Sequence, residues 1–167
     1  MRWGAFSAAL LVTLILQKTV LWVLHAPAID LFLTLAVLCA LCAPAYDARI
    51  ACWLIGLVQD LGTDPAALGS NALALGACGM MITFLRDWVQ TRDWWMRLAI
   101  SLLCAWPAQI AVALYDRLWV GHGVRSGAEL VGWAALTSII ACALAVFVAA
   151  QPWFGISRSR GSRMARR

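Results

Sequence analysis

The residues that could do chemistry are few, and their spacing forms no familiar catalytic or metal-binding motif. Cys39 and Cys42 spell C-x-x-C, but no second cysteine pair or nearby histidine accompanies them. Ser70 lies in Leu-Gly-Ser-Asn and not in G-x-S-x-G, and the chain holds no phosphate-binding loop or zinc signature. The sequence therefore predicts no catalytic residue, no cofactor and no metal.

A few charged side chains lie in or beside apolar segments, where their cost suggests a role. Lys18 could pair with Asp30 or Asp60, or extend to the lipid headgroups. Asp60 and Asp116 could form an intramembrane aspartyl pair, in which two carboxylates share a proton and activate water. The G-N-x-x-D-R signature of lipoprotein signal peptidases is absent, so we do not favour hydrolysis.

The composition requires a membrane protein. Of the 167 residues, 63% are hydrophobic and only 13% are charged, and the mean hydropathy is +0.82. A soluble domain is nearer half apolar and a quarter charged. The continuous apolar runs are those of helices, because barrel strands would alternate. We expect an all-α membrane domain over residues 1–156 and a basic, disordered cytoplasmic tail over residues 157–167.

Six apolar segments can be traced, at residues 5–24, 29–43, 50–61, 66–85, 98–115 and 130–153. The third is short for a transmembrane helix, which needs about 20 residues. Counting arginines decides whether it crosses. Six crossings from a cytoplasmic N-terminus place ten arginines inside and two outside, whereas omitting the third places eight outside and four inside. The positive-inside rule favours six transmembrane helices with both termini cytoplasmic.

The fourth segment carries a stripe of small residues at helical spacing. The stripe consists of Gly69, Ala72, Gly76, Gly79 and Thr83. Such spacing places them on one helix face, and small faces allow membrane helices to approach closely. We expect this face to pack against another helix of the same chain, with a docking face for a partner as the alternative.

The following loop repeats the triplet Arg-Asp-Trp. Its candidate interface residues are Arg86, Trp88, Arg92 and Trp94. Arginine can hold anionic lipid or a partner's carboxylate, and tryptophan anchors at the headgroups. We expect a cytoplasmic membrane-surface anchor. The basic tail is expected to enforce topology and contact membrane lipids, and not nucleic acid.

One stretch resembles a known family. Gly56 and Asp60 spell G-x-x-x-D at the end of the third segment, and the next segment opens with L-G-x-x-A-L. The matching positions and the intervening polar residue are Gly56, Asp60, Leu68, Gly69, Asn71, Ala72 and Leu73. This pattern resembles the rod shape-determining protein MreD, although the loop at residues 62–67 looks about one residue longer than is usual for the family.

The resemblance implies a non-enzymatic, multi-pass protein of the bacterial inner membrane. MreD proteins act in the cell-elongation complex with MreC, MreB, RodA and the elongation transpeptidase, which together maintain rod shape through peptidoglycan synthesis. Their fold is thought to be similar to the substrate-binding subunit of ECF-type transporters. The alternative is therefore a small-solute-binding transporter subunit, which would require Lys18, Asp60 and Asp116 to surround an enclosed pocket.

Overall fold

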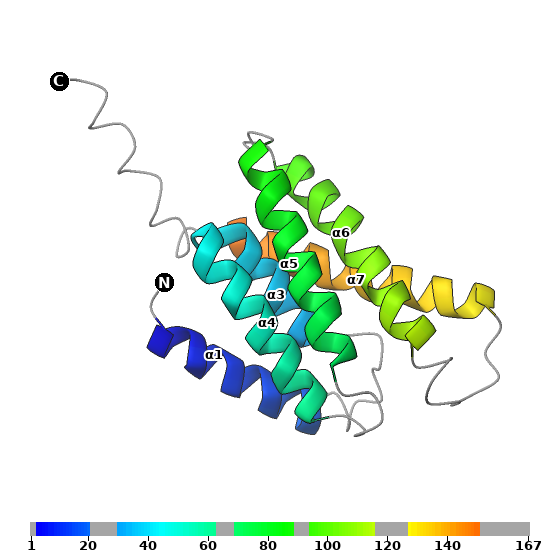
Figure 1. The fold of residues 1–167 in the computed structure, drawn as a ribbon, viewed down its shortest axis with the longest axis horizontal. Coiled ribbons are helices and arrows are strands. Elements are labelled where there is room, and N and C mark those ends of the chain that lie inside the picture. The colour runs from blue at the N-terminus through cyan, green and yellow to red at the C-terminus, as the bar shows by residue number, and fades with distance from the viewer. Residues whose placement is uncertain (1–2, 21–29, 63–68, 89–93, 116–126, 151–167) are drawn as a thin grey trace.

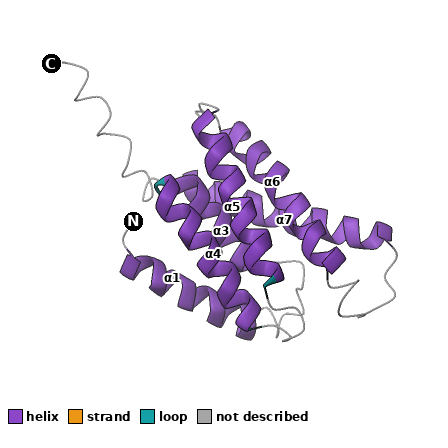
Figure 2. Ribbon diagram, viewed as in Figure 1, coloured by secondary structure: helices purple, strands orange, loops and turns teal. Residues whose placement is uncertain are grey.

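The computed structural model describes residues 3–20, 30–62, 69–88, 94–115 and 127–150, and nearly all of them are helical (Figure 1, Figure 2). The elements are α1 (Trp3–Ile15), the π-helical turn η1 (Leu16–Val20), α3 (Leu31–Cys42), α4 (Ala45–Leu61), α5 (Ser70–Trp88), α6 (Trp94–Tyr115) and α7 (Gly127–Ala150). Each apolar segment expected from the sequence overlaps one of the α-helices. The third begins earlier than its apolar run, directly after Pro44, whose fixed φ suits the start of a helix.

Helices α3, α4 and α5 run in alternating directions, and α7 lies across them (Figure 1). Different side chains meet at the two ends of α3, α4 and α5. Gln17 in η1 accepts a hydrogen bond from the first residue of α3. At the opposite end, Arg86 near the end of α5 binds carbonyls at the end of α3. We call these the aspartate end (Asp30 and Asp60, with Lys18) and the arginine end (Arg49, Arg86 and Arg97, with Asp47 and Asp87).

Helix α3 is the centre of the bundle and packs against α1, α4, α5 and α7. Its Leu33 and Val37 side chains are fully buried, together with Ile55 of α4 and Ile82 of α5. Asp30 caps the helix by accepting from the N–H groups of Phe32 and Leu33. The chain then leaves the helix at Ala43, before Pro44.

Two helices of the described part of the chain are long and apolar enough to cross a membrane. They are α6 and residues 131–149 of α7, with 17% and 33% of their apolar windows buried inside the molecule. A core helix of a soluble protein would be mostly buried, so these exposed apolar faces favour contact with lipid. The other expected spans do not meet the same criterion: α3 has only 12 residues, and α4 carries Asp47, Arg49 and Asp60.

Candidate functional site

The motif residues meet where α4 crosses α5, and we call this contact the α4–α5 interlock. Gly56 lies against the backbone of α5: a Cβ added to Gly56 would be 2.5 Å from the Cα of Ala72 and 2.6 Å from the carbonyl oxygen of Asn71. Both atoms belong to a helix backbone and cannot rotate away. Only glycine at position 56 therefore allows the two helices this separation.

Asp60 fastens the same crossing one helical turn later. Its carboxylate is 2% exposed and accepts hydrogen bonds from the backbone N–H groups of Asn71, at 3.1 Å, and Ala72, at 2.9 Å. These N–H groups lie in the first turn of α5 and have no partner within their own helix. A carboxylate from α4 thus caps α5 and complements its positive end.

The small-residue stripe of α5 is largely covered by α4. A Cβ on Gly76 would collide with the ring of Trp53, and one on Gly79 would collide with Cys52. Thr83 is fully buried and accepts a hydrogen bond from Arg49 Nε at 3.0 Å. From Gly76 to Thr83 the stripe is thus a packing face within the molecule.

Gly69 and Leu73 differ from the rest of the motif. Gly69 has a φ of 98°, which L side chains rarely adopt, and an added Cβ would meet nothing within 4 Å. Both residues line an open apolar groove of about 450 Å³ between α5 and α6, together with Ala77, Ala108 and Tyr115. Leu68 lies outside the described residues.

The arginine end departs from the expected lipid-facing anchor. Arg86 Nη1 donates to the carbonyls of Ala40, Leu41 and Ala43 at 2.8, 3.1 and 2.9 Å. These carbonyls lie at the C-terminal end of α3, where they accept no hydrogen bond from within the helix. Arg86 therefore caps α3 and is not a surface contact. Its side chain is only 18% exposed.

The tryptophans of the same loop do reach the surface. Trp88 is 78% exposed and Trp94 is 51% exposed. The rings of Trp94 and Trp95 stack with their centroids 3.8 Å apart. Arg92 lies outside the described residues. The part of the proposed interface that the structure places at the surface is therefore aromatic.

At the aspartate end, Lys18 and Asp30 both bind backbone groups. Lys18 Nζ donates to the carbonyl of Gly62, at the end of α4. Asp30 caps α3 and accepts from Gln109 Nε2 at 3.3 Å.

The aspartyl pair and the enclosed solute pocket both depend on Asp116, which lies outside the described residues. Within the described ranges, no group of three or more histidine, cysteine, aspartate or glutamate side chains could hold a metal ion. All six cysteines are free thiols, and Cys39 is buried whereas Cys42 is exposed.

Comparisons with known proteins add no assignment: no family model, curated protein or solved structure matches the chain. The likeness to MreD rests on the motif residues alone.

Several side chains that complete these contacts were not singled out from the sequence as site residues. Trp53 and Cys52 are partners of the α5 glycines, and no local pattern marks them as such. Gln109 had a detectable signal, because an amide within the otherwise apolar second half of α6 is costly unless it is bonded.

Proposed function

We propose that the chain is a non-enzymatic scaffold subunit of the bacterial cell-elongation complex, similar to MreD and acting with MreC, MreB, RodA and the elongation transpeptidase. The α4–α5 interlock carries this proposal. It gives three of the motif positions a joint purpose: Gly56 admits the backbone of Ala72, and Asp60 caps the helix whose first turn contains Ala72. A motif whose residues pack and cap helices suits a scaffold, which needs a defined fold and not a catalytic site.

The proposed location is the bacterial inner membrane, with six crossings and both termini in the cytoplasm. Six helices that each cross once would return the chain to the side of the membrane on which it begins. Arg49, Arg86 and Arg97 gather at one end of the bundle, which agrees with the positive-inside rule. Helices shorter than about 20 residues can cross where the bilayer thins or flanking residues extend to the interface.

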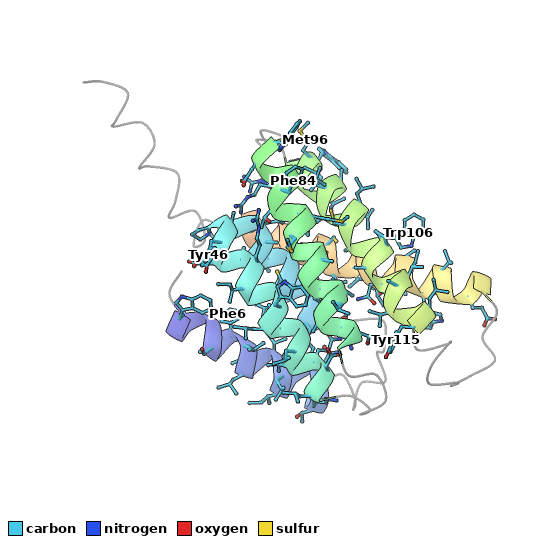
Figure 3. The ribbon with its side chains drawn as sticks, in the orientation of Figure 1. Phe6, Tyr46, Phe84, Met96, Trp106 and Tyr115 are labelled. Atoms are coloured by element: carbon cyan, nitrogen blue, oxygen red, sulfur yellow. The ribbon has the colours of Figure 1, made fainter. Side chains whose placement is uncertain are left out.

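The proposed interaction surface is the exposed apolar side of the bundle. Large side chains such as Trp106 on α6 project outward, as Figure 3 shows. Leu103 of α6 and Phe147 of α7 are similarly exposed. Membrane lipids and the membrane helices of partner proteins are the occupants that suit such a surface.

Co-purification from the native cell tests this proposal. A tagged chain extracted in mild detergent is expected to retain MreC, and Asp60→Ala and Gly69→Leu are expected to retain less, because both disturb the start of α5. Gly132→Ala is the matched control, because an added Cβ there meets nothing within 4 Å. Failure of the unaltered chain to retain MreC, or normal retention and cell shape with both variants, would contradict the proposal.

A further inference from the structure

The guanidinium group of Arg49 is anchored at the arginine end with most of its hydrogen-bond donors unused. Arg49 Nε donates to Thr83 Oγ1 at 3.0 Å, which holds this side chain of α4 against α5. A guanidinium has five N–H donors. In the part of the chain that the structure describes, the two Nη groups of Arg49 make no hydrogen bond and are not buried. Four N–H donors are therefore available to a ligand outside the bundle.

Two further guanidinium groups lie at the same end. Arg86 follows Thr83 by one helical turn on α5. Arg97 of α6 and Arg86 both act electrostatically on the thiol of Cys42, at the end of α3, so these two groups also lie near each other. The described residues of the arginine end supply two carboxylates against these three positive charges, and one of the two lies 3.7 Å from Arg86 Nε. The end therefore has an excess of one positive charge.

An exposed apolar surface begins one helical turn from Arg49, toward the middle of α4 and α5. Trp53 of α4 is exposed, and its ring lies against Gly76 of α5. Met80, one turn after Gly76, is exposed as well. Trp88, at the end of α5, is in the position of a tryptophan at a membrane–water interface. The surface thus offers a cationic group at its edge and apolar side chains beyond it, which suits an amphipathic anion.

We propose that the arginine end binds an anionic phospholipid, with Arg49 donating to the phosphate oxygens and the acyl chains lying along Trp53 and Met80. A guanidinium can donate two parallel hydrogen bonds to a phosphate group. Phosphatidylglycerol carries a single negative charge, which matches the excess of one positive charge at this end. Anionic lipids give the cytoplasmic leaflet its negative surface potential, so the inference rests on the proposed cytoplasmic position of the arginine end.

Thermal unfolding of the purified full chain in dodecyl maltoside tests the proposal, with phosphatidylglycerol or phosphatidylcholine of the same acyl chains added to the micelles. Phosphatidylglycerol is expected to raise the melting temperature along a saturating curve, by roughly 3 °C more than phosphatidylcholine does. Arg49→Gln should increase the half-saturating phosphatidylglycerol fraction about fivefold, the contribution of one basic residue near an anionic lipid surface. Arg49→Lys keeps the charge but loses the paired donors and should fall between. Arg97→Gln leaves the bond from Arg49 to Thr83 in place and should also weaken the response.

The matched control is Lys18→Gln, which removes one positive charge at the aspartate end. Its difference in melting temperature between the two lipids should equal that of the unaltered chain. An equal response to both lipids, or an undiminished phosphatidylglycerol response in Arg49→Gln, would overturn the proposal. A rise of the same size with inorganic phosphate, at equal ionic strength, would show that a free anion suffices and would overturn it too. Since only the purified chain is used, the result is separate from the retention of MreC, which tests the proposed scaffold.

Discussion

At the scale of single residues, the glycines differ in whether a neighbouring helix requires them. Gly56 and Gly132 have the same intrinsic effect on a helix, but only Gly56 faces another backbone. The sequence pattern marks Gly56 as part of a motif because Asp60 follows one turn later, on the same helix face. Distance to a neighbouring backbone, which no local pattern encodes, decides whether a glycine can be replaced.

We predict that Gly56→Ala destabilises the protein by about 1–3 kcal/mol, because the backbones of α4 and α5 would have to separate. Thermal unfolding in mild detergent measures the loss. Gly132→Ala, which enters open space, should be neutral or stabilising by up to about 1 kcal/mol through helix propensity. Equal shifts for the two variants would show that the close approach of α4 to α5 is not the cause.

Asp60→Ala is predicted to lower stability by about 0.5–2 kcal/mol, the range for loss of an N-terminal cap. Two backbone N–H groups, of Asn71 and Ala72, would lose their acceptor. Hydrogen exchange should therefore accelerate at these two amides first. Asp60→Asn keeps one acceptor oxygen and should fall between, and unchanged protection at both amides in Asp60→Ala would refute the cap.

At the scale of elements, the positions of the helices could be predicted from the sequence. The hydrogen bonds between residues far apart in the sequence could not. Continuous apolar runs located all six segments, because a helix in an apolar environment must satisfy its own backbone. The spacing of Gly56 and Asp60 marked the two α4 residues of the α4–α5 interlock as a motif. In contrast, Arg86 and Ala40 are separated by 46 residues, and only the folded structure shows that they meet. The π-helical turn likewise has no signature in Leu-Gln-Lys-Thr-Val.

Replacement of Arg86 should loosen the end of α3 and leave α5 itself intact. Arg86→Met removes a charged donor shared by three carbonyls, and we expect a loss of about 1.5–3 kcal/mol. Hydrogen exchange should increase at residues 40–43 because the last turn of α3 would fray. Arg86→Lys keeps the charge and should recover part of the protection. Equal exchange in the Met variant and the unaltered chain would show that the cap contributes nothing.

At the scale of the whole molecule, the charged side chains lie at the two ends and the exposed sides are apolar. The arginine end and the aspartate end lie at opposite ends of α3, α4 and α5, and large apolar side chains are exposed on α6 and α7. Among the described helices, only α6 and α7 are individually long and apolar enough to cross. In the proposed topology, the remaining helices would enter the bilayer as parts of a packed bundle. Their polar groups are tolerable there because they cap other helices, as Asp60 and Arg86 do.

This arrangement predicts the sides on which fusions will lie. A green fluorescent protein fused after Arg167 should fluoresce and an alkaline phosphatase at the same place should be inactive, because moving the arginine end through lipid is unfavourable. Fusions within residues 63–68, between α4 and α5, should give the opposite pattern. An active phosphatase after Arg167 would require an odd number of crossings and would contradict the proposed topology. The two fusion points are separated by α5, α6 and α7, so they differ as stated only if an odd number of these three helices cross.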